Sequence, residues 1–282
     1  MSATLGIIAG NGPLPVLVAR AAKARGMRIV ATAMNGETDP AIDREADAVR
    51  WVPVGKLGKI LETLQRGGVR QALFAGGLDK KRFFGRVEPD VAALTLLNRL
   101  RMRGDDSVLS AVADYFAENG VTIVDSTSLL PELFITKGVL TRRSPDADEW
   151  RDIEHGLLVA RALGALDVGQ CVVVRRGVVT AVEAIDGTDA TIRRGGDLAE
   201  GGAVVVKVTK PKQDLRFDLP AVGLGTLRVM REVRARALAV EAGRTLIFDR
   251  DEFIRVANRG GIAVVGMPPV DETVAKGSEK RR

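Results

Sequence analysis

The chain has 282 residues, which is long for one domain and typical of two. Hydrophobic residues make up 46% of it and exclude wholesale disorder, while an aromatic content of 4% leaves few platforms for stacking nucleic-acid bases. The formal net charge of +6 suits a polyanionic partner, such as a nucleic acid, an anionic membrane surface or a phosphorylated small molecule.

Strands and helices are predicted to alternate through the first half of the chain. Short apolar runs predict strands at residues 5–9, 28–33, 49–54, 72–75 and 121–124. Amphipathic patterns predict helices at residues 14–25, 55–65, 90–101 and 106–118. We therefore predict a Rossmann-like, doubly wound α/β domain over residues 1–132.

A glycine turn, Gly10-Asn11-Gly12-Pro13, follows the first predicted strand and leads into a helix. Free amide groups at the start of a helix can face a phosphate. Asn11 readily takes the left-handed backbone conformation, so the turn tolerates it between two glycines. Pro15 stands where the dinucleotide-binding fingerprint has its third glycine, which argues against a nicotinamide cofactor. A plain strand-to-helix turn is the alternative.

Two more features of the first domain are candidates for ligand contact. Gly76 and Gly77 end the fourth predicted strand, as expected at the binding edge of a doubly wound sheet. Asp105 and Asp106 precede or open a helix. Either they cap that helix, or one of them reaches a cation or a sugar hydroxyl, and the sequence leaves both readings open.

A second α/β domain is predicted over residues 133–271, and residues 272–282 are expected to form a disordered tail. Its predicted strands are residues 171–174, 178–184, 203–208, 245–249 and 262–266, and its predicted helices are residues 148–163, 226–238 and 251–257. A further helix carries Arg193 and Arg194 and is expected to be capped by Thr188 or Asp189. The helix over 226–238 is basic, and we expect its arginines to be solvated.

The rarest residue types limit the chemistry. Cys171 is the only cysteine and His155 the only histidine, so disulfide frameworks and zinc sites built on thiolates or several imidazoles are excluded. A metal would have to be held by oxygen, which favours Mg²⁺ or Mn²⁺. The apolar runs are too short to span a bilayer and the N-terminus lacks the positive start of a signal peptide, so we expect a cytoplasmic protein.

Acids and bases lie close together between residues 183 and 220. Glu183 ends an apolar run, Lys207 and Lys210 flank the end of a predicted strand, and Asp218 stands in a Phe-Asp-Leu-Pro setting. Acids that can hold a hard cation beside bases that can hold phosphate suggest phosphoryl chemistry. A surface hairpin with solvated charges is the alternative.

Several motifs in a fixed order resemble those of the LpxI-type UDP-2,3-diacylglucosamine pyrophosphatases of lipid A biosynthesis. The resemblance runs from Leu5 to about Gly266. It is carried by residues 6–15, Phe74-Ala75-Gly76, Gly104-Asp105-Asp106, Asp167-Val168-Gly169-Gln170, Ala181-Val182-Glu183-Ala184, Gly187-Thr188-Asp189-Ala190, Lys210-Pro211-Lys212-Gln213, Asp218-Leu219-Pro220 and Glu241-Ala242-Gly243-Arg244.

This resemblance implies a lipid-metabolic hydrolase with two domains and the substrate between them. Water would attack the α-phosphorus of UDP-2,3-diacylglucosamine and release UMP and 2,3-diacylglucosamine 1-phosphate. The resemblance also implies dependence on Mg²⁺, with Mn²⁺ as a substitute, and a catalytic aspartate at the position of Asp218. A peripheral position on the inner face of the cytoplasmic membrane would bring the enzyme to its lipid substrate. Whether the molecule dimerises is left open.

Site residues follow from the residue chemistry and from this resemblance together. The predicted catalytic residues are Asp218, Asp189 and Glu183, of which Asp218 and Asp189 are also the predicted metal ligands. The predicted substrate-binding residues are Gly10, Asn11, Gly12, Gly76, Asp105, Thr188, Arg194, Lys207, Lys210 and Gln213.

Three other functions compete with the hydrolase. A non-catalytic sugar-nucleotide or nucleotide binder on the same scaffold is the nearest, and loss of Asp218 would favour it, but this chain keeps that residue. A nucleic-acid-binding protein fits the net charge but lacks a basic motif with interleaved aromatic residues. A nicotinamide-dependent oxidoreductase lacks the third glycine of its fingerprint.

Overall fold

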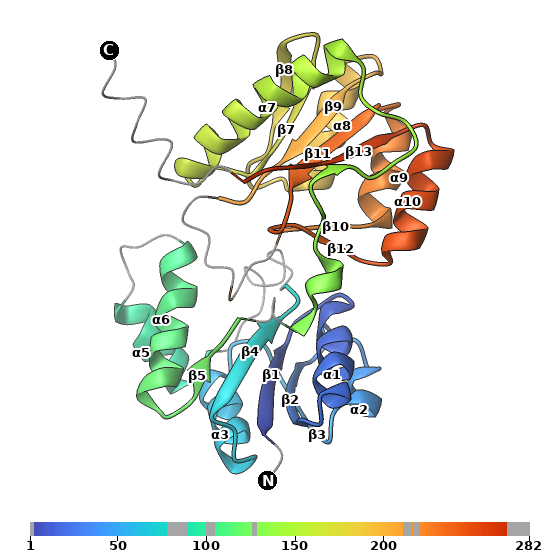
Figure 1. Ribbon diagram of the computed structural model, residues 1–282. Coiled ribbons are helices and arrows are strands. Elements are labelled where there is room, and N and C mark those ends of the chain that lie inside the picture. The colour runs from blue at the N-terminus through green and yellow to red at the C-terminus, as the bar shows by residue number, and fades with distance from the viewer. Residues whose placement is uncertain are drawn as a thin grey trace, which may run out of the picture. The chain divides into compact units, whose positions relative to one another are not determined.

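The structure is a computed structural model that describes residues 3–77, 89–99, 105–125, 129–210, 216 and 220–269, with side chains left undescribed at 97–99 and 105–109. Two compact units divide the chain between Pro131 and Glu132. Each unit is a β-sheet covered by helices on both faces (Figure 1). The predicted fold class, a Rossmann-like domain followed by a second α/β domain, is therefore confirmed.

The first unit is built on a parallel five-stranded sheet in the order β3-β2-β1-β4-β5. Its strands are β1 (Thr4–Ala9), β2 (Arg28–Met34), β3 (Ala48–Val52), β4 (Gln71–Ala75) and β5 (Thr122–Ile123). The chain winds from β1 outward to β3 and then crosses to β4 on the other side of β1. In open sheets of this kind, ligands bind at the carboxyl ends of the strands beside such a switch point.

Helices cover both faces of this first sheet (Figure 1). They are α1 (Leu14–Ala24) and α2 (Ile42–Glu45) on one face and α3 (Leu57–Arg66), α5 (Val91–Arg99) and α6 (Asp105–Glu118) on the other. Leu61 and Leu64 of α3 pack with Phe116 of α6 against Ile8 and Val30 of the sheet. The apolar residues of α3 recur three and four positions apart, which is why one face of that helix is buried.

The second unit has a mixed six-stranded sheet in the order β6-β13-β11-β9-β7-β8. Its strands are β6 (Gly138–Val139), β7 (Cys171–Arg175), β8 (Val178–Val182), β9 (Val204–Lys207), β11 (Ala237–Glu241) and β13 (Ala263–Met267). β9, β11 and β13 run parallel, whereas β7 is antiparallel to both β8 and β9. A separate parallel pair is formed by β10 (Ala221–Val222) and β12 (Leu246–Ile247).

Helices also cover both faces of the second sheet. They are α7 (Ala147–Ala165) on one face and α8 (Thr188–Leu198), α9 (Leu224–Glu232) and α10 (Arg250–Arg259) on the other. A short 3₁₀ helix spans Pro131–Leu133. Gly156 lets α7 approach β9 closely, because a Cβ atom there would lie 2.5 Å from Val206 Cγ2. The valine-rich strands are buried on both sides, as expected for the centre of such a sheet.

One predicted element is wrong. The basic helix expected over residues 226–238 ends at Glu232, and Arg234 takes a left-handed backbone with φ 54°. The chain then enters β11, which lies between β9 and β13 in the middle of the sheet. Leu238 belongs to that strand and is fully buried. A short apolar run does not by itself distinguish a buried strand from a buried stretch of helix.

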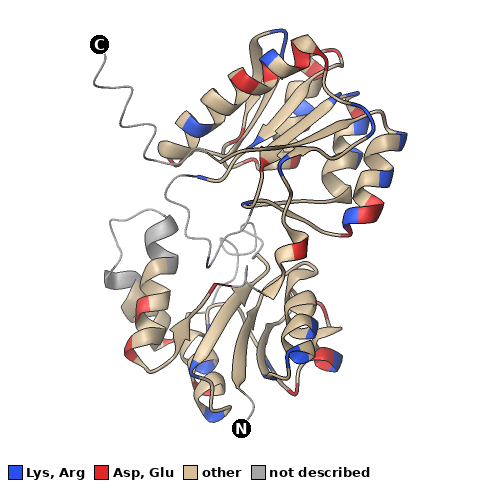
Figure 2. Ribbon diagram, in the orientation of Figure 1, with Lys and Arg blue, Asp and Glu red and all other residues tan. Residues whose placement is uncertain are grey.

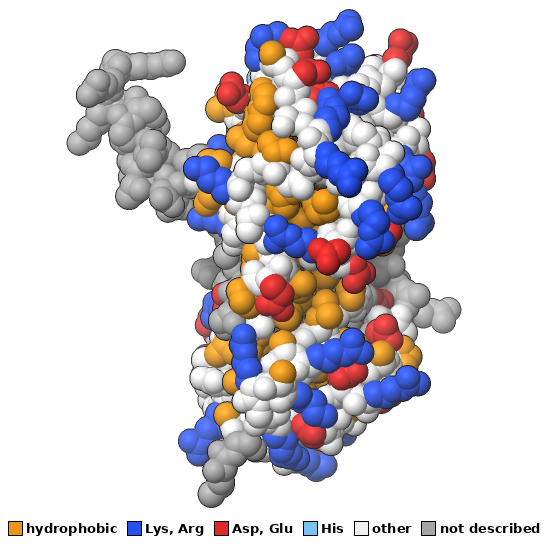
Figure 3. All heavy atoms as spheres, turned by 45° about the vertical axis from the view of Figure 1, so that its right-hand side comes forward, with side chains coloured by type: hydrophobic (Ala, Val, Ile, Leu, Met, Phe, Trp, Pro, Cys, Tyr) orange, Lys and Arg blue, Asp and Glu red, His pale blue; other side chains and the backbone are white. Residues whose placement is uncertain are grey.

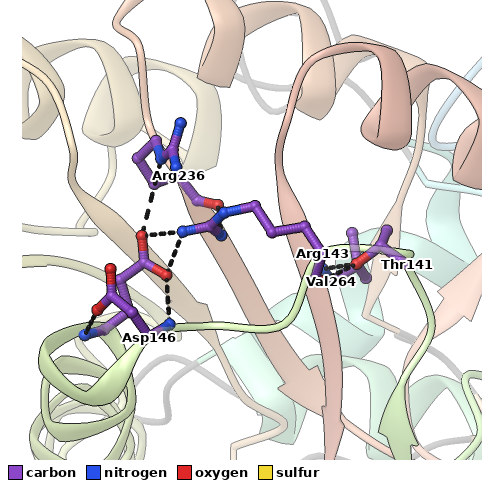
Figure 4. Close-up of polar contacts among 6 residues, drawn as sticks. Thr141, Arg143, Asp146, Arg236 and Val264 are labelled. Atoms are coloured by element: carbon purple, nitrogen blue, oxygen red, sulfur yellow. Dashed lines mark hydrogen bonds and ion pairs between the residues drawn. The ribbon is translucent and has the colours of Figure 1, made fainter.

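The start of α7 is fixed by the buried carboxylate of Glu149. Asp146 caps the helix by accepting from Glu149 N at 2.9 Å, and Glu149 Oε2 accepts from Asp146 N at 3.0 Å. Arg143 donates to the same carboxylate and, at 3.1 Å, to the carbonyl of Arg236 just before β11. Arg236 Nε lies 3.8 Å from Glu149 Oε1. Figure 4 shows Arg143, Asp146 and Arg236 around the carboxylate to which they are bound or close.

Charged residues lie mainly on the helices and loops, while the strands carry few of them (Figure 2). The arginines at positions 228, 231, 234 and 236 are exposed, so their expected solvation is confirmed. On the face drawn in Figure 3, basic side chains are interspersed with acidic and apolar ones. Among the described residues, no helix is both long and apolar enough to cross a membrane.

Candidate functional site

In the first unit, two glycine turns meet at the switch point beside β1 and β4. Gly10 N donates to Ala75 O and Asn11 N donates to Gly77 O, both at 2.8 Å. A Cβ atom on Gly10 would lie 2.3 Å from Gly77 O, and one on Gly76 would lie 2.1 Å from Asn11 O. Glycine at positions 10 and 76 is therefore required by the packing of one turn against the other.

The backbone of the first turn differs from our expectation for Asn11. Gly12 takes the positive φ, at 80°, whereas Asn11 is not among the residues with positive φ. Pro13 is the N-cap of α1 and Pro15 lies in its first turn, so two positions there carry no N–H donor. This helix start offers a phosphate fewer amides than an ordinary helix does.

The side chain of Asn11 connects three strand ends. Asn11 Oδ1 accepts from Gly77 N after β4, and Asn11 Nδ2 donates to Glu37 Oε2 after β2, each at 3.2 Å. The loop that carries Glu37 is held by its neighbour Thr38, whose buried hydroxyl donates to Ala9 O at 2.6 Å and accepts from Met34 N at 2.8 Å. The Glu37 carboxylate is thus placed at the carboxyl edge of the sheet. Our sequence reasoning did not include it.

In the second unit, polar side chains gather at one edge of the sheet. The ends of β8, β9 and β11 meet the start of β7 there, because Val182 pairs with Val172 and Lys207 pairs with both Cys171 and Val240. We call this the polar edge and define it by Gln170, Glu183, Lys207, Thr209 and Glu241.

Glu183 follows β8 as predicted, and the residue is 8% exposed. Glu183 Oε1 accepts from Thr188 Oγ1 at 2.8 Å, and Oε2 accepts from Gln170 N at 3.3 Å. The predicted capping of α8 by Thr188 or Asp189 is wrong. The N-cap is Gly187, with φ 82° and no side-chain cap, and Thr188 uses its hydroxyl to hold Glu183 instead.

Lys207 is a buried cation at the polar edge. Its side chain does not point into solvent, since the residue is 8% exposed and Nζ donates to Ala221 O at 3.2 Å. Burial raises the pKa of the neighbouring Cys171 thiol far above its ordinary value, and the negative charge of Glu183 raises it further, whereas Lys207 opposes the shift. Cys171 therefore stays a neutral thiol and is not a nucleophile.

Glu241, at the end of β11, is almost fully buried, with 2% exposed. Its Oε2 accepts from Thr209 N at 3.0 Å, and its Oε1 lies 3.3 Å from Arg161 Nη2. Glu241 thereby fixes the backbone that leaves β9. Like Glu183, Glu241 is an acid at the end of an apolar run. The strand that precedes it was not predicted, because a helix was expected over residues 226–238.

Two predicted phosphate-binding residues are engaged in ion pairs. Arg194 donates to Asp186 Oδ2 at 2.7 Å and to Val182 O at 3.1 Å. The Arg194 guanidinium is the main cause of a lowered pKa for Asp186, and the Ala184 amide adds to it. Lys210 pairs with Asp167 at 2.5 Å. Both cations would have to exchange or share these partners to bind a phosphate.

Several predicted residues lie outside what the structure describes. Asp218 and Gln213 fall outside the described residues, and Asp105 is placed at the start of α6 without a described side chain. Asp189 lies in the first turn of α8 and is exposed. The structure therefore brings Glu183, Thr188 and Lys207 together at the polar edge, while Gly10, Asn11, Gly12 and Gly76 form the turns of the first unit.

Comparison with known families matches nearly the whole chain. The LpxI N-terminal domain family matches residues 4–133, and the LpxI C-terminal domain family matches residues 136–265. A protein of Caulobacter vibrioides named UDP-2,3-diacylglucosamine pyrophosphatase LpxI is 37% identical over 276 residues, covering 94% of this chain and 98% of the relative. The chain belongs to the LpxI family.

Solved structures similar to this LpxI-family chain are much more distant. A Rhizobium etli pyruvate carboxylase with acetyl coenzyme A is 15% identical, covers 60% of this chain and 13% of its own, and has a TM-score of 0.30. A Campylobacter jejuni biotin carboxylase complex is 10% identical, covers 70% of this chain and 42% of its own, and has a TM-score of 0.29. These scores are too low to support a conclusion.

Three buried side-chain oxygens near the polar edge have no hydrogen-bond partner in the described part of this LpxI-family chain. They are Gln170 Oε1, Thr209 Oγ1 and Thr245 Oγ1. Gln170 O accepts from Val208 N, so the first two belong to adjacent segments. Buried polar groups are nearly always paired in native proteins, so unpaired ones collected in one region call for an explanation such as a ligand or ordered water.

The oxygen atoms at the polar edge are of the kind that binds a hard cation, but the described residues do not form a complete set of metal ligands by themselves. The acids and unpaired groups at the polar edge offer oxygen, the ligand that Mg²⁺ prefers. However, no group of three or more His, Cys, Asp or Glu side chains that could hold a metal occurs within the described ranges. A Mg²⁺ ion here would fit the usual arrangement of one or two carboxylates, substrate phosphates and water.

Proposed function

We propose that this LpxI-family chain hydrolyses the pyrophosphate of UDP-2,3-diacylglucosamine in lipid A biosynthesis. Water attacks the α-phosphorus, and the products are UMP and 2,3-diacylglucosamine 1-phosphate. The observation that carries the proposal is the 37% identity, over almost the full length of both chains, to the relative named for this pyrophosphatase activity. The substrate is an acylated lipid, so the enzyme would act at the inner surface of the cytoplasmic membrane.

The polar edge supplies residues suited to this reaction. Cleavage of a pyrophosphate concentrates negative charge on non-bridging oxygens and on the leaving phosphate, and fixed positive charges stabilise it. The structure gives the Lys207 ammonium one acceptor among the described residues, Ala221 O, so two of its three N–H donors remain for a phosphate. Its burial strengthens such a contact, because the interaction is screened less than at the surface.

Glu183 is suited to orienting the attacking water. Thr188 and Gln170 hold the carboxylate from two sides, which fixes its direction without neutralising its charge. Each carboxylate oxygen has a second lone pair that can accept from a water molecule. Asp218 and Asp189 would hold Mg²⁺, or Mn²⁺ in its place, and the bound cation would offset the charge that develops on the phosphate oxygens.

The test is UMP release from UDP-2,3-diacylglucosamine with Mg²⁺ by wild type, Asp218→Ala and the control Asp148→Asn, which alters an exposed acid on α7. We expect release by wild type and control and none by Asp218→Ala. Release in ¹⁸O-labelled water should place the label in UMP, whereas label in the sugar phosphate would move the attack to the other phosphorus. Release that persists in EDTA would refute the requirement for a metal. Substrate binding without release would reduce the protein to a sugar-nucleotide binder.

A further inference from the structure

We propose that Glu37 accepts a hydrogen bond from the ribose 2′-hydroxyl of the substrate's nucleotide and makes the enzyme selective for ribonucleotides. The inference rests on the proposed function for the identity of the nucleotide. It concerns a residue of the first unit that the motifs of the sequence did not single out. Its support is the position of Glu37 in the sheet, the contacts that hold it, and its chemistry.

The position of Glu37 follows from the strand order. β1 lies between β2 and β4, so the turns after these three strands meet at one edge of the sheet. Gly10 and Gly12 follow β1, Gly76 follows β4, and Glu37 follows β2. In doubly wound sheets the ligand lies beside the turn after the first strand, and an acid after the second strand is placed to reach the ribose of a bound nucleotide.

The contacts show that Glu37 is held in place. Asn11 Nδ2 donates to Glu37 Oε2 at 3.2 Å, while Asn11 Oδ1 is fixed by Gly77 N at the same distance. The loop behind Glu37 is anchored by the 5% exposed Thr38, whose hydroxyl joins Met34 N to Ala9 O. A side chain on so constrained a loop loses little conformational freedom when it binds a ligand.

The chemistry favours a sugar over a phosphate at this point. A carboxylate accepts hydrogen bonds from hydroxyl groups and repels phosphate oxygens. Pro13 and Pro15 remove two N–H donors from the adjoining helix start, so the first turn of α1 is poorly equipped for an anion. Beside Gly12, no atom of the described residues lies within 4 Å of a Cβ atom built there.

Calorimetric titration of the full chain with UMP and with 2′-deoxyUMP tests the inference. Wild type should bind UMP about tenfold more tightly, the ratio expected for one hydrogen bond to a charged acceptor. Glu37→Ala should lose this ratio through weaker UMP binding and keep its affinity for 2′-deoxyUMP. Glu37→Gln, which keeps an acceptor for Asn11, should give an intermediate ratio. The control Glu45→Gln, an acid of the same unit paired with Arg20 on the surface, should leave the ratio unchanged.

The outcomes separate this inference from the proposed function. A wild type that binds both nucleotides equally, or neither, overturns it, as does a Glu37→Ala variant that weakens both equally, because that result indicates a structural role. UMP release assayed on the same preparations is independent. Ribose selectivity without hydrolysis supports Glu37 and rejects the hydrolase, whereas hydrolysis with a ratio insensitive to Glu37 rejects the inference alone.

Discussion

Removal of the Glu149 carboxylate should destabilise the second unit and leave the first unaffected. The carboxylate is only 5% exposed and accepts from Arg143 and from the amide of Asp146, with Arg236 nearby. Glu149→Ala removes the acceptor of the helix N-cap and leaves two arginines facing an uncharged gap. Loss of one partner from a buried ion pair is strongly destabilising because the other charge stays buried.

The size of the effect follows from how buried the remaining charge is. Breaking a buried pair costs about 3–5 kcal/mol. Arg143 is 23% exposed and keeps the carbonyl of Arg236 as an acceptor at 3.1 Å, so we place Glu149→Ala at the lower end, about 3 kcal/mol. Glu149→Gln keeps the shape and an acceptor for Asp146 N but loses the charge, so we expect a loss of unfolding free energy of about 1.5 kcal/mol. The control Asp148→Ala alters an exposed acid one residue earlier and should cost about 0.5 kcal/mol or less.

The two tryptophans allow each unit to be followed by itself, which matters because a two-unit chain need not unfold in one step. In a Trp51→Phe background, the fluorescence of Trp150, on α7, reports urea unfolding of the second unit. In a Trp150→Phe background, Trp51, on β3, reports the first. Equal, small losses for Glu149→Ala and Asp148→Ala in the second-unit signal would refute the role of the buried carboxylate. A shift confined to Trp51 would place the effect in the wrong unit.

Two further predictions concern the polar edge and the surface beside it. Glu183→Gln removes the charge and keeps one acceptor oxygen, which can serve the amide of Gln170, while its new NH2 group can donate to the hydroxyl oxygen of Thr188. It should therefore unfold close to wild type and release UMP at least about 100-fold more slowly, as expected for loss of a group acting in general base catalysis; unchanged turnover would remove Glu183 from the site. Asp186 has a pKa lowered mainly by Arg194, so its contribution, about 0.5 kcal/mol for such an exposed pair, is present above the ordinary pKa of 3.8 and lost as pH falls below it. Asp186→Asn should therefore flatten the acid limb of a plot of melting temperature against pH, and an unaltered limb would contradict this.

The fold could be predicted because strands of the first unit such as β1 and β4 end at marked turns. Apolar runs such as residues 5–9 and 72–75 are bounded by glycines, and the helices between them show a clear apolar stripe. β11 could not be predicted, because the arginine-rich segment before it continues a helical pattern past Glu232. The helix ends there because residues 238–240 form a strand that is buried between β9 and β13. This tertiary packing overrides the local helical pattern and cannot be read from the sequence of the segment itself.

Residues of the candidate site could be predicted where the local sequence pattern marks them. They could not be predicted where their position depends on a contact with a residue far away in the chain. Glu183 was recognised as an acid at the exit of a hairpin strand, and the hairpin itself brings Gln170 to it. Glu37 is recognised as a site residue only through its hydrogen bond with Asn11, which lies 26 positions earlier in the chain. Glu241 depends on a strand that was mistaken for a helix. The role of Asp218 remains a prediction, since it lies outside the described residues.

Buried acids alone do not distinguish the polar edge of the second sheet as the candidate site, because both edges contain them. At the opposite edge, Asp152 is 1% exposed and accepts from the amides of Arg176 and Gly177 at 2.8 and 2.6 Å, and Glu149 is held by arginines. Those acids are bound by groups of the protein, which is the pattern of a structural role.

The polar edge differs in what is left over. Gln170 and Thr209, in segments beside Glu183 and Lys207, each keep a buried oxygen without a partner among the described residues. So does Thr245, which directly precedes Leu246, the strand partner of Ala221, whose carbonyl accepts from Lys207. Each unpaired buried group lowers the stability of the folded state by about 1–3 kcal/mol. Three of them in one region therefore destabilise the folded chain as long as they have no partner. A bound polar ligand with its water shell would supply the missing partners. This surplus of unpaired oxygens, more than the acids themselves, is the physical reason to look for the pyrophosphate at this edge.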